Sequence, residues 1–192
     1  DGARPHRLDR LPGLRWARHA RSVPSVPVCV NRNPLRSRRP PEPPVPELPE
    51  IAAAVEQLAQ AIAGKTVVRL EVLHAALAKK MPRKAASSLR GMVIVGVERR
   101  GKHQVVRLGD GRVIVAHFRL NGEWEVGRQH DPVPRFARAL LAMDDGTRVA
   151  LVDSRALASL VLAATAAAVL PSMGPEADDP AFTAAALGAA LA

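Results

Sequence analysis

The sequence predicts an α+β fold that is mainly β: a two-sheet β-sandwich, or flattened barrel, with a packed helix at its amino-terminal end and a second helix at its carboxyl-terminal end. Three observations lead to this prediction. Short apolar runs recur along residues 66–153, glycine-containing turns separate them, and one amphipathic segment precedes them all. Closely spaced strands joined by tight turns are typical of antiparallel sandwiches and barrels, because each strand can pair with the next.

The first expected element is an amphipathic helix that starts around Pro49. Its apolar residues are Ile51, Val55, Leu58 and Ile62. Their spacing of four, three and four residues places them on one helix face. Pro49 and Glu50 suit a first helical turn, and Gly64 suits the residue that follows the end of a helix.

Strands and turns then alternate. We expect strands over residues 66–73, 92–98, 103–108, 112–118, 123–126, 139–143 and 148–153, a short helix over 84–89 and a final helix over 180–191. The turns are Arg100-Gly101, Gly109-Asp110-Gly111, Asn121-Gly122 and Asp144-Asp145-Gly146. Asp-Gly and Asn-Gly pairs between apolar runs are the strongest short-range hairpin signal, so each of these turns is expected to join two paired strands.

Most of the positive charge lies in the first 44 residues. The whole chain has a formal net charge of +10, and residues 1–44 hold ten arginines, no lysine and three acidic residues. They also hold nine of the 17 prolines and show no helical or strand periodicity, so we expect a disordered tail. Two interpretations stay open: a basic arm that grips phosphates, or GC-rich upstream sequence that has been translated through.

Cysteine content and hydrophobicity exclude several classes of protein. The single cysteine, Cys29, excludes a disulfide or a cysteine-based zinc site within this chain and favours a reducing compartment. The longest apolar stretch, residues 156–170, is shorter than the roughly 18 to 20 residues of a membrane-spanning helix. Pro24 and Pro27 interrupt the only candidate for the apolar region of a signal peptide. No metal-ligand spacing relates His74, His117 and His130. We therefore expect a cytoplasmic protein with no membrane partner.

Several separated motifs occur in a fixed order. They are Pro46-Glu47-Leu48-Pro49-Glu50, Arg99-Arg100-Gly101-Lys102, His117-Phe118-Arg119-Leu120-Asn121-Gly122, Asp153-Ser154-Arg155 and Met173-Gly174-Pro175-Glu176. Their order and spacing resemble the formamidopyrimidine-DNA glycosylase and endonuclease VIII family, closest to its formamidopyrimidine branch. The resemblance covers residues 45–192.

The resemblance implies a domain organisation. In the family, a β-sandwich whose first helix carries the terminal proline precedes a half made of a helix-two-turn-helix module and a zinc finger. We therefore expect a tail over 1–44, an amino-terminal catalytic domain over 45–178, and the first helix of a truncated helix-two-turn-helix module over 179–192. The family's zinc would belong to its second half, so no cofactor is expected in this chain.

The resemblance also implies an activity: base-excision repair of double-stranded damaged DNA by a monomeric, nucleoid-associated enzyme of bacterial type. Such an enzyme removes oxidised purines (8-oxoguanine and formamidopyrimidines) and cleaves the strand as an AP lyase. Pro46 would be the nucleophile that forms a Schiff base. Only a terminal proline is a secondary amine, because an internal proline nitrogen is an amide without a basic lone pair. Val45 would then mark a GTG start codon. Without the resemblance, Pro46 reads as a helix-entry proline.

Two acidic residues and a lysine complete the implied catalytic site. Glu47 would act as general acid and base, and Glu50 on the same turn would be its positional partner. Lys102 would bind a phosphate beside the lesion. Without the resemblance, Glu47 is a carboxylate favoured by the helix dipole and Lys102 is an exposed strand lysine.

Three further residues match positions that fill the gap left when the damaged nucleotide is turned out of the duplex. In the family they are a methionine, an arginine and a phenylalanine, and here they are Leu120, Arg155 and Leu157. Leucine can still act as an apolar wedge, but the loss of the ring at Leu157 removes a stacking surface of ~1–3 kcal/mol. We expect Leu120 at an exposed hairpin tip; the alternative for both leucines is ordinary β-sheet core.

Two more departures from the family pattern affect DNA contacts. Arg135, Phe136 and Arg138 stand where the family usually has a lysine-histidine pair followed by a histidine. The two arginines could replace the lost phosphate contact of the imidazole. Ala156 stands at a position that is usually arginine.

Two alternatives to an active enzyme remain. One is a catalytically inactive damaged-DNA-binding relative or fragment that keeps Lys102 and Arg155 but has no free amine. The other is an unrelated β-sandwich interaction module, which the hairpin signals alone would support.

Overall fold

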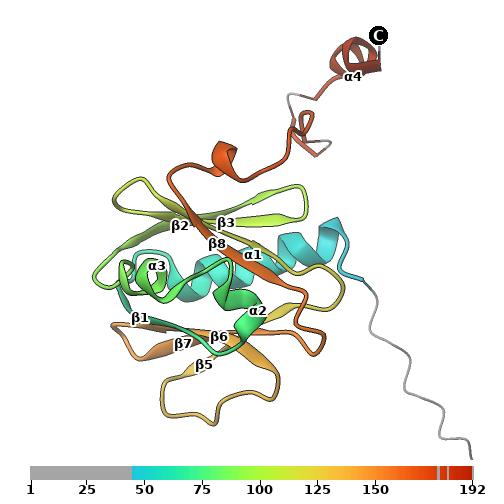
Figure 1. The fold of residues 1–192 in the computed structure, drawn as a ribbon. Helices are drawn as coiled ribbons and strands as arrows, with labels where there is room; N and C mark the ends of the chain where they lie inside the picture. The colour runs from blue at the N-terminus through green and yellow to red at the C-terminus, as the bar shows by residue number, and fades with distance from the viewer. Residues whose placement is uncertain (1–44, 177, 181, 192) are drawn as a thin grey trace, which may run out of the picture. The chain divides into compact units, whose positions relative to one another are not determined.

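A computed structural model describes residues 45–176, 178–180 and 182–191. The predicted disordered tail, residues 1–44, lies outside the described residues. Two four-stranded antiparallel sheets pack together (Figure 1). One sheet has the order β1-β6-β7-β5: β1 Val67–Val72, β6 Ala137–Met143, β7 Thr147–Val152 and β5 Glu123–Arg128. The other has the order β2-β3-β4-β8: β2 Ile94–Arg100, β3 His103–Leu108, β4 Val113–His117 and β8 Ser159–Ala163. The predicted sandwich is confirmed.

The first helix, α1 Leu48–Ile62, contacts both sheets through its apolar face. Ile51, Leu58 and Ile62 are buried in the main core, and Val55 packs against it, as their spacing predicts. The helix ends just before Gly64, whose φ of 78° is a left-handed conformation that glycine adopts without steric cost. The Gly64 amide donates to the carbonyl of Ile94, 2.8 Å away, and so ties the helix end to β2.

Three of the four predicted hairpin turns join paired strands: β2 to β3, β3 to β4, and β6 to β7. The fourth prediction, at Asn121-Gly122, is wrong. This turn carries the chain from β4 in one sheet to β5 in the other, because β4 already pairs with β3 on one side and β8 on the other. The crossing is tight: a Cβ at Gly122 would lie 2.9 Å from the backbone of Phe118.

Some elements were not predicted or have different bounds. The short helix predicted over 84–89 is α3 Arg83–Ser87, and α2 Ala75–Ala78 precedes it. The apolar stretch 156–170 contains the unpredicted strand β8 and a 3-10 turn, η1 Ala166–Ala168. The final helix, α4, is Ala184–Leu191 and begins later than expected. Within the described ranges, no helix is long and apolar enough to cross a membrane.

Candidate functional site

The start of α1 faces the turn between β2 and β3. Glu47 caps the helix, and its backbone N–H donates to Oε2 of Glu50 at 3.1 Å. The Lys102 Nζ atom lies 2.6 Å from Oε2 of Glu47. Pro46, half-buried, directly precedes Glu47. The structure therefore brings together all four residues for which the resemblance implies chemistry or phosphate binding at this end: Pro46, Glu47, Glu50 and Lys102.

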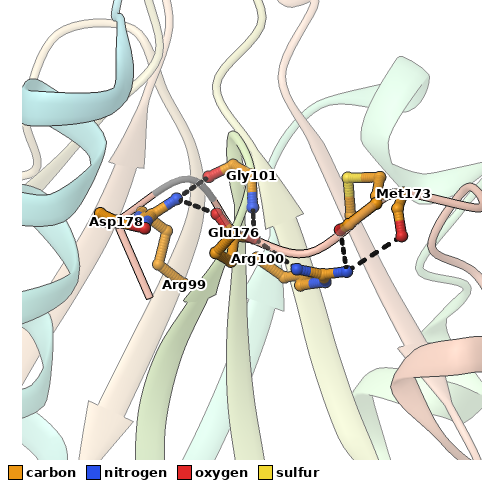
Figure 2. Close-up of polar contacts among 7 residues, drawn as sticks. Arg99, Arg100, Gly101, Met173, Glu176 and Asp178 are labelled. Atoms are coloured by element: carbon orange, nitrogen blue, oxygen red, sulfur yellow. Dashed lines mark hydrogen bonds and ion pairs between the residues drawn. The ribbon is translucent and has the colours of Figure 1, made fainter. Parts of the chain in front are cut away.

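The turn that carries Lys102 is fixed by a segment from the far end of the domain. The Glu176 carboxylate accepts hydrogen bonds from Arg99 (2.8 Å), Arg100 (2.9 Å) and the backbone N–H of Gly101 (2.7 Å), as Figure 2 shows. We call this cluster of Arg99, Arg100, Gly101 and Glu176 the Glu176 clamp. Burial opposes ionisation of Glu176, but the Gly101 amide and the Arg99 guanidinium outweigh it and lower the pKa of the carboxyl.

Three further contacts tighten the clamp. Arg100 donates to the carbonyls of Met173 (3.1 Å) and Gly174 (2.7 Å), and Arg99 also pairs with Asp178 (Figure 2). Gly101 has a φ of 54°, and a Cβ there would lie 3.1 Å from the sulfur of Met173. The two sequence motifs that contain Lys102 and Glu176 are thus parts of one packed unit.

Two histidines line the same edge of the sheet. His103 and His117 are register partners in β3 and β4, and their rings meet edge to face at 4.6 Å. The pKa of His117 is lowered to about 4, first by burial and then by His103 and the nearby positive charges of Arg119, Lys102 and Lys80. Burial also lowers the pKa of His103. Both rings are therefore neutral at pH 7, and the charge at this edge comes from lysine and arginine.

This edge also carries the loop residues singled out in the sequence. His117 pairs with Ser159 of β8, so the turn after β4 and the loop before β8 emerge side by side. The Asn121 side chain in the first donates to Oγ of Ser154 in the second. Leu120 is 37% exposed and Leu157 is 46% exposed, so the core interpretation of both leucines is wrong. Leu120 is exposed as expected, but in a turn between sheets and not at a hairpin tip.

Asp153 organises the second loop, a role that the sequence analysis missed. Its side chain is fully buried and accepts backbone hydrogen bonds from Arg155 (2.9 Å), Leu157 (2.6 Å) and Ala158 (2.6 Å). The sequence does hold one signal for this role: an aspartate at the end of a strand, followed by a polar residue. The short carboxylate of such an aspartate can accept hydrogen bonds from the next backbone amides. Arg155 and Leu157 are thereby held in a defined loop.

A third segment, residues 134–138, joins the same loop. The carbonyl of Phe136 accepts from the backbone N–H of Asp153 at 3.1 Å. Arg138 donates to the carbonyls of Asp153 (2.6 Å) and Ser154 (3.1 Å). The guanidinium of Arg135 lies 4.6 Å from the centre of the Phe136 ring. We call the three segments, residues 118–122, 134–138 and 153–158, the Asp153 loop cluster.

Metal ligands are not grouped in the described ranges of the chain. No set of three or more His, Cys, Asp or Glu side chains is placed there to hold a metal ion.

Comparisons with known proteins point to one family. A family model for the formamidopyrimidine-DNA glycosylase N-terminal domain matches residues 45–160. The formamidopyrimidine-DNA glycosylase of Moorella thermoacetica is 34% identical over 131 residues, 66% of this chain and 48% of the relative. That of Acidiphilium cryptum is 31% identical over 145 residues, 73% of this chain and 52% of the relative. The chain spans about half the length of the curated relatives it matches.

Solved structures share the fold. That of Lactococcus lactis formamidopyrimidine-DNA glycosylase, bound non-covalently to DNA containing an AP site, aligns with a TM-score of 0.58. Its sequence identity is 21%, and the alignment covers 62% of this chain and 45% of that one. The family match itself extends over more than half of the 192 residues and begins at the residue before Pro46. This chain belongs to the formamidopyrimidine-DNA glycosylase family.

Proposed function

We propose that the domain beginning at Pro46 is the amino-terminal catalytic domain of a DNA glycosylase and AP lyase that removes oxidised purines, among them 8-oxoguanine and formamidopyrimidines. The observation that carries this proposal is the contact of 2.6 Å between Glu47 and Lys102, directly beside Pro46. A nucleophile, a proton carrier and a phosphate-binding cation then lie at one point, which is what attack on a nucleoside in DNA requires.

The proposed reaction has two stages. The amine of Pro46 attacks C1′ of the damaged nucleotide, the bond from C1′ to the base breaks, and the base leaves with a proton. The bond from C1′ to the ring oxygen O4′ then breaks, O4′ takes a proton, and C1′ and the proline nitrogen are left joined as an iminium. The iminium acidifies the hydrogens at C2′, so that loss of one of them expels the 3′ phosphate and cleaves the strand. Glu47 would carry protons in both stages, while Lys102 holds the flanking phosphate.

The nucleophile must be a free amine. In the sequence as printed, Val45 precedes Pro46, so the proline nitrogen is an amide. The proposal therefore includes an active form that begins at Pro46, produced by initiation at codon 45 as GTG and removal of the initiator methionine. The nucleotide sequence would test the first step directly.

The Asp153 loop cluster would contact the DNA around the lesion. Leu120 and Leu157 are exposed on it and would fill the gap left in the duplex, together with Arg155. Arg135 and Arg138 would add positive charge facing phosphates, although Arg138 also holds the loop of Asp153. Solved relatives bound to DNA with an AP site or with 8-oxoguanine support duplex DNA as the partner.

Borohydride trapping tests the proposal. A protein that begins at Pro46 should form a covalent adduct with a duplex containing an abasic site, and Pro46→Gly should reduce the yield at least tenfold. Because the match covers only 48% of the Moorella thermoacetica relative, the reaction is run with and without the carboxyl-terminal half of that relative fused to residue 192. Glu56→Gln, an exposed change further along α1, serves as the matched control. Equal trapping by the full chain with an intact amino terminus would contradict the proline mechanism.

A second candidate function is binding of damaged DNA without catalysis. The amide at Pro46 favours it for the chain as printed. In that case the protein would bind an abasic-site duplex but give no adduct, whether or not it begins at Pro46.

A further inference from the structure

Phe136 is an aromatic residue that lies outside the hydrophobic core. It is 42% exposed and lies just before strand β6, whereas Phe118 is 3% exposed and packs edge to face on Trp124. Exposed phenylalanine leaves apolar surface in water and gains nothing from the core. The position therefore calls for a different explanation from packing.

The backbone at Phe136 is strained. Its φ is 66°, a region that bulky residues without special support rarely occupy and that costs on the order of 1 kcal/mol or more. Within the described part of the chain, the non-glycine residues with positive φ are Arg119, Phe136 and Ala156. All three belong to the Asp153 loop cluster. Strain of this kind collects at binding sites, because the surrounding structure must impose it to aim a side chain.

The support for this strained conformation comes from the same residue that holds Leu157. The backbone N–H of Asp153 donates to the carbonyl of Phe136, and the carboxylate of Asp153 accepts from the amide of Leu157 at 2.6 Å. On the other side of Phe136, Ala137 pairs with Val152 of β7. Phe136 and Leu157 are thus attached to one buried residue, and the loop of Leu120 joins them through Ser154.

The positive charges beside the Phe136 ring are suited to binding a nucleic acid. Arg135 lies over the Phe136 ring at 4.6 Å and Arg138 at 6.0 Å from its centre. A guanidinium over an aromatic face is attracted by the ring and can at the same time reach a phosphate. A stacking ring flanked by cations is how proteins hold unpaired nucleobases without reading their sequence.

We propose that Phe136 stacks on the nucleobase left unpaired opposite the lesion, and so supplies the aromatic surface that Leu157 lacks. This inference rests on the proposed binding of damaged DNA. It assigns the stacking contact to a different segment, between β5 and β6, while Leu120 and Leu157 remain apolar wedges.

The salt dependence of binding separates stacking from charge. The full chain is titrated into a labelled duplex with a tetrahydrofuran abasic analogue, over a range of salt concentrations, with fluorescence anisotropy as the readout. Phe136→Gly removes the ring and relieves the positive φ, so its melting temperature should not fall. It should bind about tenfold more weakly with an unchanged salt slope. Phe136→Trp keeps a ring and should bind within about threefold of the parent.

Two controls sharpen the test. Val133→Ala, which alters a 56% exposed side chain in the same connection, should bind like the parent. Arg135→Ala should lower the salt slope by about one unit. Parent-like binding by Phe136→Gly would overturn the inference, as would a loss accompanied by a lower slope, since the ring would then act only through Arg135. If neither the parent chain nor its fusion to the carboxyl-terminal half of the Moorella thermoacetica relative binds the duplex even at low salt, the proposed function is overturned, and the inference with it.

Discussion

The Glu176 clamp and the Asp153 loop cluster lie at the same edge of the sandwich but are held in opposite ways. In the clamp, the charges face each other: the side chains of Arg99 and Glu176 are only 12% and 21% exposed, and the guanidiniums neutralise the carboxylate. In the loop cluster, the buried carboxylate of Asp153 is bonded to backbone amides. Leu120, Phe136 and Leu157 of these loops are exposed.

This difference separates two tasks. In the clamp, the charged groups pair with one another and fix the turn between β2 and β3. This turn places Lys102 opposite Glu47. The loop cluster is ordered by the Asp153 carboxylate, by Asn121 and by Arg138, whereas Leu120, Leu157 and Phe136 are exposed. A region of the first kind is suited to positioning chemistry, and one of the second kind to binding.

Removal of the Asp153 carboxylate should have the largest effect on stability. In Asp153→Ala, three backbone N–H groups lose their acceptor in a buried place, which should lower the free energy of unfolding by about 3 kcal/mol. Urea denaturation followed by circular dichroism measures it. Glu125→Ala, an exposed change in β5, should cost less than about 0.5 kcal/mol. A loss of under 1 kcal/mol in Asp153→Ala would mean that the loops are held by other contacts.

Neutralising the clamp should have a smaller effect that depends on pH. Glu176→Gln should lower the free energy of unfolding by about 1 kcal/mol at pH 7. The folded pKa of Glu176 lies below its ordinary value of 4.5, so its ionic contribution is complete above that value and is lost as the pH falls through the folded pKa. The parent and Glu176→Gln should therefore converge at acidic pH.

The control for the clamp is an exposed ion pair. Glu98 and Arg107 are 51% and 60% exposed, with 3.4 Å between their charged atoms. Glu98→Gln should change stability by less than about 0.5 kcal/mol at any pH. A gap between the parent and Glu176→Gln that persists unchanged at low pH would show that the carboxylate charge is not what the clamp depends on.

The smallest expected effect concerns His117, which lies between the two regions. Its folded pKa of about 4 is below the ordinary 6.5, so the unfolded chain binds more protons between these values and stability falls as the pH drops from 6.5 to 4. Its ring is half-buried, so the change should be about 1 kcal/mol or less. His117→Asn should flatten that part of the profile, and His130→Asn, which alters an 85% exposed ring, should not. An unaltered profile in His117→Asn would place the titration elsewhere.

Local patterns suffice to predict much of this fold. The face of α1 follows from the spacing of Ile51, Leu58 and Ile62, and three turns follow from their glycines. Asn121-Gly122 misleads because the same turn chemistry serves a hairpin and a change of sheet, and only the pairing of β4 with β8 decides between them. Strand β8 was missed because its alanine-rich surroundings show no alternation.

The candidate site also contains some residues that the sequence can predict and others that it cannot. The motifs that carry the resemblance single out Pro46, Glu47 and Lys102, and the structure brings these three residues together; their catalytic roles stay a prediction. The role of Asp153 and the exposure of Phe136 cannot be predicted in this way, since one depends on three amides brought within reach by folding and the other on a backbone angle. The resemblance also pointed to Leu157 as the replacement for a ring, whereas the exposed ring lies on another segment.

The arrangement of the strands sets an order in which the domain can be assembled during synthesis. Strands β2, β3 and β4 pair with their immediate neighbours in sequence, so this meander can form from contacts close along the chain. In contrast, β1 can pair only after β6 has been synthesised, β5 only after β7, and the second side of β4 only after β8. The turn of Leu120 and the loop of Arg155 come together only with the last of these pairings. The surface proposed to meet DNA is therefore completed late in folding, and the Glu176 clamp, whose carboxylate follows β8 in the chain, is completed later still.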